Sequence, residues 1–171
     1  MAPEIEELAE RIEKLEEDEE KALSIIVTKG ELDEAYPALI LGSTAASFGW
    51  DVNIFFTFYG LEIVHEDNHK NLSMSPLGNT FFSVPNIISI IPGMEHLMTW
   101  FMKRKMNSHG VASVEELVEL SLEAGIDFQA CQMTMELFGY EDEELLEGVK
   151  SGVGAASALN DMSETDMQLL I

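Results

Sequence analysis

This chain of 171 residues has very few cysteines and few positive charges, and each shortage excludes something. Its one cysteine cannot form an internal disulfide, so a secreted disulfide framework and a CxxC dithiol site are both excluded within one chain. Nine Lys plus Arg against 32 Asp plus Glu give a net charge of −23. Such a surface repels nucleic-acid phosphates and anionic lipid headgroups, so we expect no nucleic-acid binding. It also suits a high-salt cytoplasm, as in a halophilic archaeon.

Several sequence signatures of other protein classes are missing as well. The acidic N-terminus is the opposite of a signal peptide, so we expect a cytoplasmic protein. There is no P-loop and no GxSxG nucleophile elbow. Gly152-x-Gly154 is only a fragment of a dinucleotide fingerprint, and we interpret it as a tight turn. His65 and His69 are four residues apart, as in some metal sites, but we interpret them as surface or loop histidines. The ten methionines favour pliable packing over copper binding, so we expect no metal.

The chain is long enough for one domain with a sizeable core, and 46% of its residues are hydrophobic. Apolar, β-rich runs alternate with helix-like segments along most of it. This order predicts an α/β fold with a parallel sheet and right-handed crossovers. The predicted strands are 22–28, 51–58, 126–130 and 167–171, with a short one near Val149.

Two segments fall outside this alternation. The pattern of residues 1–21 predicts an acidic amphipathic helix, because apolar side chains recur every three or four positions. Residues 68–107 form an apolar, Met-rich insertion in the domain 22–171. Its stretch 81–105 is too short and too broken by proline to span a membrane, which takes about 20 apolar residues. It could contact a membrane surface, but subunit packing suits the charge of the chain better.

Cys131 is the residue with the clearest chemical potential. It lies between the strand-like run 126–130 and the helix-like run 132–138. Free N–H groups and the positive end of a helix dipole favour a thiolate at such a junction, and the thiolate is the reactive form. The alternative is a small buried hydrophobe, since free cysteine is among the most buried residue types.

The carboxyl ends of the predicted strands support the first interpretation. Ligands gather at that edge of an open parallel sheet. The residues that follow the strands are 28–31, 57–60, 131–134 and 152–154. If the strands are parallel, all four groups meet on one edge, with Cys131 among them.

The chain resembles the DsrE/DsrF-like family of sulfur-relay proteins, in its larger single-chain branch. The resemblance covers about residues 22–171. It is carried by Asn53-Ile-Phe-Phe-Thr-Phe-Tyr-Gly-Leu61, by Ala130-Cys-Gln-Met-Thr-Met135, by the segment 92–106 and by the closing Leu169-Leu-Ile171. It implies a parallel, roughly five-stranded sheet with helices on both faces, a symmetric homo-oligomer and no metal or organic cofactor. It also implies a cysteine that carries sulfane sulfur as a persulfide or thiosulfonate, which would be Cys131.

The expected function is therefore a sulfur carrier or sulfurtransferase that exchanges sulfur with rhodanese-like or sulfur-carrier proteins. We expect Tyr59, Gly60, Gln132 and Met133 to line its pocket, and 68–107 to form a flap or a subunit interface. Because the chain has no second cysteine, exchange must occur with another molecule. Two alternatives stay open: a thiol peroxidase, which would need a cation beside the thiolate, and a non-catalytic scaffold with a core cysteine.

Overall fold

The computed structural model of the chain describes residues 21–74 and 94–171. The predicted helix over 1–21 and residues 75–93 of the insertion lie outside the described residues. The described part is an α/β fold, as predicted, with a five-stranded sheet in the order β4-β3-β2-β1-β5. Every neighbouring pair in it is parallel. The strands are β1 (Ala22–Val27), β2 (Asp51–Phe56), β3 (Asp127–Cys131), β4 (Lys150–Val153) and β5 (Met167–Leu170).

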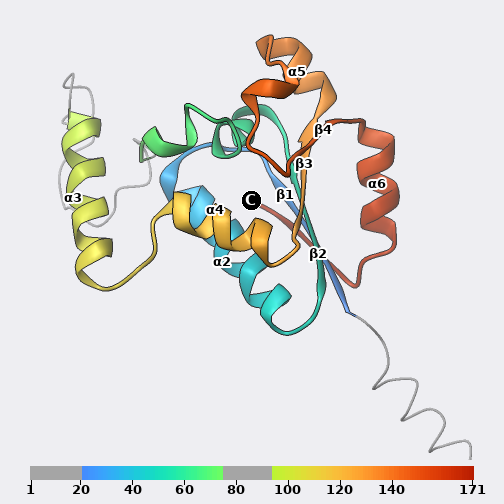
Figure 1. Cartoon of the computed structure of the whole chain (residues 1–171), viewed down its shortest axis with the longest axis horizontal. Helices are drawn as coiled ribbons and strands as arrows, with labels where there is room; N and C mark the ends of the chain where they lie inside the picture. Colours follow the sequence, from blue (N-terminus) through green and yellow to red (C-terminus); the bar gives the residue numbers. More distant parts are fainter. Residues whose placement is uncertain (1–20, 75–93) are drawn as a thin grey trace, which may run out of the picture.

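Helices cover both faces of the sheet. Figure 1 shows α2 and α4 on one face and α6 on the other, with α5 at the carboxyl end of β3. The helix α3 lies beside the 3-10 turn 69–71, away from α5, and its Lys103 Nζ donates to the carbonyl oxygen of Lys70. The helices are α2 (Leu32–Ser47), α3 (Met94–Ser108), α4 (Val114–Glu123), α5 (Gln132–Phe138) and α6 (Ala155–Ser163). Within residues 21–74 and 94–171, the 3-10 turns are Phe58–Ile63, His69–Asn71 and Asp142–Glu144.

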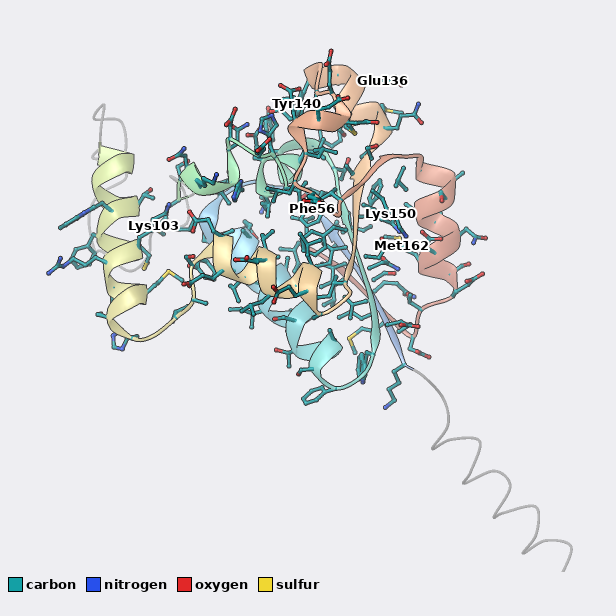
Figure 2. All side chains as sticks on the ribbon, viewed as in Figure 1. Phe56, Lys103, Glu136, Tyr140, Lys150 and Met162 are labelled. Carbon is teal, nitrogen blue, oxygen red and sulfur yellow. The ribbon has the colours of Figure 1, made fainter. Side chains whose placement is uncertain are left out.

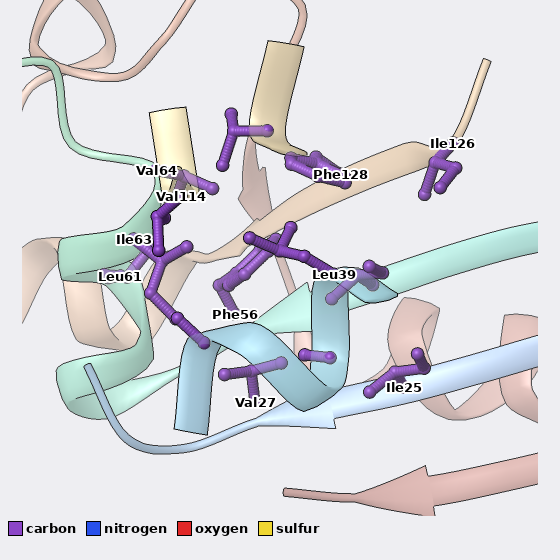
Figure 3. Close-up of a cluster of buried hydrophobic side chains, with 14 of the residues drawn as sticks. Ile25, Val27, Leu39, Phe56, Leu61, Ile63, Val64, Val114, Ile126 and Phe128 are labelled. Carbon is purple, nitrogen blue, oxygen red and sulfur yellow. The ribbon is translucent and has the colours of Figure 1, made fainter. Parts of the chain in front are cut away.

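The main core lies between the sheet and the α2/α4 layer. Alternate residues of the central strands point into it, as in Ile25 and Val27 of β1. Phe56 and Phe128 are fully buried there, with ring centroids 5.1 Å apart in an edge-to-face arrangement. Figure 3 shows these side chains around Leu39 of α2. A smaller cluster on the opposite face, beneath α6, contains Phe55, Cys131 and Ala158.

Local signals explain most of the helix boundaries. Ser113 and Glu116 form a reciprocal capping box at the start of α4. Glu116 N–H donates to Ser113 Oγ at 3.2 Å, and Ser113 N–H donates to Glu116 Oε2 at 2.8 Å. Gly139 closes α5 in the left-handed conformation, with φ of 75°. In the part of the chain that the structure describes, none of the helices is long and apolar enough to cross a membrane.

Candidate functional site

Cys131 is the last residue of β3 and the first flanking residue of α5. Because the strands are parallel, the segments that follow β1, β2 and β4 begin at the same edge of the sheet as Cys131. Val153 of β4 is paired in register with Cys131 on one side, and Phe56 with its neighbour Ala130 on the other. The predicted convergence of strand ends around the thiol is therefore present. The Cys131 side chain is 8% exposed.

Two threonine hydroxyls lie at the thiol. Thr57 follows β2, and Thr134 is in the first turn of α5; their Oγ1 atoms are 3.1 Å apart. The backbone N–H of Phe58 donates to Thr134 Oγ1 at 3.1 Å, which leaves the Thr134 hydroxyl proton free to point at the sulfur. The site thus joins the loop after β2 to the start of α5.

These groups change the acidity of the thiol. Burial raises the pKa of Cys131, but hydrogen bonds from the hydroxyls of Thr134 and Thr57 and from the backbone N–H groups of Thr134 and Met133 outweigh it. The pKa therefore lies below its ordinary value, and more of the nucleophilic thiolate is present near neutral pH. Among the described residues, the groups that lower the pKa of Cys131 are all neutral hydrogen-bond donors. None of these groups is the cation that a thiol peroxidase would need beside its thiolate.

Thr134→Val should raise the pKa of Cys131, because valine keeps the shape of threonine without its hydroxyl. We expect alkylation by iodoacetamide at pH 7 to slow by about three- to tenfold, since a hydrogen bond to a charged group contributes about 1.5–3 kcal/mol and a more basic thiolate is also more nucleophilic. At high pH, where both thiols are ionised, the variant should react at least as fast. Thr134→Ser is the matched control. Parallel pH–rate curves for the Val variant and the native protein would contradict this role.

The four other predicted site residues take different positions. Gly60 is buried, with its N–H donating to the Thr57 carbonyl oxygen at 3.0 Å. Tyr59 is 65% exposed and lies against Phe138, with ring centroids 5.8 Å apart. Met133 is 73% exposed, and Gln132 donates to Glu136 Oε1 at 3.0 Å. They lie on two segments, the turn after β2 and the start of α5, and their role in a pocket stays a prediction.

His65 and His69 lie in the loop segment between β2 and α3, but the prediction that they are at the surface was wrong. His65 and His69 are 6% and 7% exposed, because the segment that holds them pairs with residues 144–145. His65 Nδ1 accepts the Asp67 N–H at 3.2 Å, and His69 Nδ1 donates to the His65 carbonyl oxygen at 2.9 Å. Within residues 21–74 and 94–171, no group of three His, Cys, Asp or Glu side chains could hold a metal ion.

Tyr140 connects this histidine segment to the end of α5. Its hydroxyl donates to Glu62 Oε1 at 2.6 Å, and its ring lies 4.5 Å from that of His65. Burial, followed by the hydrogen bond to Glu62, raises the pKa of Tyr140 to about 12. The neutral phenol therefore stabilises the fold below pH 10, and this contribution is lost as the pH rises through 12.

Tyr140→Phe should remove the component of the 295 nm absorbance titration that ionises near pH 12. It should also lower the free energy of unfolding at pH 8 by about 1 kcal/mol, the usual size of one lost hydrogen bond. Urea unfolding at pH 8 and above pH 10 measures the second effect. Loss of a component near pH 10 instead would show that Tyr140 ionises normally.

The fold and the site together define a class: a parallel α/β protein with one thiol, of lowered pKa, at a strand–helix junction. A family model described as the DsrE/DsrF/DrsH-like family matches residues 19–170. The sulfur carrier protein DsrE2 of Allochromatium vinosum is 45% identical over 161 residues, covering 90% of this chain and 99% of that protein. The chain belongs to the DsrE/DsrF/DrsH-like family, which confirms the resemblance inferred from its motifs.

More distant relatives agree with this assignment. The uncharacterized protein YrkE of Bacillus subtilis is 28% identical over 163 residues, covering 88% of this chain and 97% of that protein. The crystal structure of the ychN protein from E. coli has the same fold, with a TM-score of 0.56 over 90% of this chain and all of that one, at 10% identity. At that identity the match supports the fold alone.

Proposed function

We propose that this protein is a sulfur carrier that holds sulfane sulfur on Cys131 and passes it to a partner protein. The observation that carries the proposal is the thiol itself. It is the only one in the chain, its pKa is lowered by Thr57, Thr134 and the first turn of α5, and it lies at the edge where parallel sheets bind ligands. The relative named a sulfur carrier, 45% identical over nearly the whole chain, supports the same chemistry.

Loading needs only a thiolate and a donor with a sulfur–sulfur bond. The Cys131 thiolate attacks the outer sulfur of a polysulfide or donor persulfide, a new S–S bond forms, and the donor leaves as a thiolate or shorter polysulfide. With tetrathionate, thiosulfate leaves and a thiosulfonate remains on the protein. A buried site suits such a species, because water and stray thiols are kept from it.

Intact mass spectrometry after incubation with polysulfide or tetrathionate tests this proposal. We expect the mass of one added sulfur, or of one thiosulfonate group, and its loss on treatment with reductant. Peroxide consumption, measured on the same preparation, separates this function from a thiol peroxidase. A protein that takes up no sulfur, with a thiol that reacts with maleimide only after unfolding, would make Cys131 a core residue instead.

We also propose a cytoplasmic location and a homo-oligomer. One unpaired thiol that must stay reduced suits a reducing compartment. Exposed apolar side chains on α2 and at its C-cap, namely Ile40, Leu41 and Phe48, are the kind of surface that a second subunit covers.

A further inference from the structure

The surface beside Cys131 is unusually apolar for so acidic a protein. Met133 and Leu137 lie four residues apart, on one side of α5, and are 73% and 67% exposed. Tyr59, on the loop after β2, is exposed too and packs its ring near Phe138 of the same helix. We call Tyr59, Met133 and Leu137 the apolar patch. Met133 is the second residue of α5, which begins directly after Cys131, and its backbone N–H donates to the thiol, so this end of the patch lies next to the reactive sulfur.

Acidic side chains border this patch. A hollow of about 510 Å³ next to α5 is lined by Glu136, Glu141 and Asp142, together with Gln132, which directly follows Cys131. The two segments that build this end of the molecule, 58–69 and 131–149, contain nine acidic residues and no Lys or Arg. The nine are Glu62, Glu66, Asp67, Glu136, Glu141, Asp142, Glu143, Glu144 and Glu147.

Basic residues border these segments but do not lie within them. Lys29, after β1, is ion-paired with Glu34, and Lys70 directly follows the first segment. Lys150, at the start of β4, forms an ion pair with Asp127 at 2.8 Å. Lys103 belongs to α3, and Figure 2 shows it at the left of the view, away from Glu136 and Tyr140 at the top. A partner that approaches the thiol therefore meets an apolar centre with a negative rim.

We propose that this surface binds a sulfur-exchanging protein whose contact face is apolar at its centre and basic at its rim. This proposal rests on the proposed function. Charge complementarity selects such a partner over an acidic one. The burial of Cys131 requires the partner's reactive sulfur to be brought in at the centre of the contact. A rim of this kind also speeds association by electrostatic steering.

The transfer step balances without an oxidant. The partner's cysteine thiolate attacks the outer sulfur of the Cys131 persulfide, and the bond between the two sulfur atoms on the carrier breaks. Cys131 leaves as a thiolate, which the hydroxyls of Thr57 and Thr134 stabilise. The partner gains the persulfide, and the proton that its thiol lost returns to Cys131 or to solvent. No net oxidation or reduction occurs.

Two synthetic peptides serve as probes. Each has one cysteine between leucines, with lysines at the outer positions in one peptide and glutamates in the other. The protein is loaded with polysulfide, and sulfur transfer to each peptide is followed by mass spectrometry at low salt. After correction for each peptide's reactivity with glutathione persulfide, we expect the lysine peptide to react at least about tenfold faster. About 1 M salt should remove most of this preference, because it shortens the Debye length to about 3 Å.

Two triple variants with the same change in net charge locate the effect. Glu66→Gln, Glu136→Gln and Glu143→Gln together should reduce the preference for the lysine peptide severalfold. Glu119→Gln, Glu123→Gln and Glu164→Gln, on exposed positions of α4 and at the end of α6, should leave it unchanged. Equal rates for the two peptides, or equal effects of the two triple variants, would overturn the docking proposal while leaving the sulfur-carrier function intact.

A binding measurement that involves no sulfur transfer tests the docking surface separately from the sulfur-carrier function. Fluorescence anisotropy with peptides that carry serine in place of cysteine measures docking to the unloaded protein. If Cys131 takes up no sulfur, the proposed function fails, yet tighter binding of the lysine peptide, weakened only by the local triple variant, would still support the docking surface. Equal binding of both serine peptides would overturn it.

Discussion

Cys131→Ser is expected to abolish sulfur uptake completely. Serine lacks the polarizable nucleophile, and no other thiol exists in the chain to replace it. The measurement is intact mass after incubation with polysulfide or tetrathionate, with native protein alongside. The native protein should gain one adduct that reductant removes, and the variant should gain none.

The variant must keep its fold for this result to count. Cys131 packs in a small cluster with Phe55 and Ala158, so a serine there should cost only about 1–3 kcal/mol, and circular dichroism checks the fold. Met167→Leu is the matched control, because it removes a side-chain sulfur on β5, outside the proposed site, and should load normally. Residual uptake by Cys131→Ser would mean that sulfur binds elsewhere.

Gly60→Ala is expected to have the largest effect on stability. A Cβ at this position would overlap with the carbonyl oxygen of Val27 at the end of β1, and both groups are backbone, so neither can rotate away. We expect the free energy of unfolding to fall by about 2–4 kcal/mol, a large share of the usual 5–15 kcal/mol. Urea unfolding measures it. Thiol reactivity near neutral pH should fall as well, because the displaced loop carries Thr57.

Gly154→Ala provides the comparison for this effect. Gly154 precedes α6 with φ of −76°, and a Cβ there would meet nothing within 4 Å. Its stability should stay within about 1 kcal/mol of the native protein. An equally small loss of stability in Gly60→Ala would contradict the close packing of the loop after β2 against β1.

Local sequence patterns predicted the elements that place the thiol. The strand that leads to Cys131 and the helix after it follow from short-range signals, and the parallel sheet follows from the alternation of strands and helices. The parallel sheet then implied that the strand ends meet. The thiol's position at that edge was therefore predictable before any coordinates.

The groups that tune the thiol were not predictable in the same way. Thr57 and Thr134 are 77 residues apart, and only the folded chain brings their hydroxyls together. The strand predicted over 51–58 ends at Phe56, because Phe58 has a positive φ of 48° and begins a 3-10 turn. Its aromatic side chain gives a strand signal, whereas its backbone is held by the hydrogen bond to Thr134. Burial of His65 likewise depends on its pairing with Leu145, far along the chain.

The most direct test of the sulfur-carrier account is the fate of the loaded sulfur. The native protein is loaded with polysulfide of a heavy sulfur isotope, freed of excess donor, and mixed with an unlabelled thiol acceptor, while both masses are followed over time. The account predicts that the heavy sulfur leaves Cys131 and appears on the acceptor in equal amount, at a rate that falls in Thr134→Val at pH 7. Heavy sulfur that stays on the protein, or that is released only as free sulfide, would contradict it.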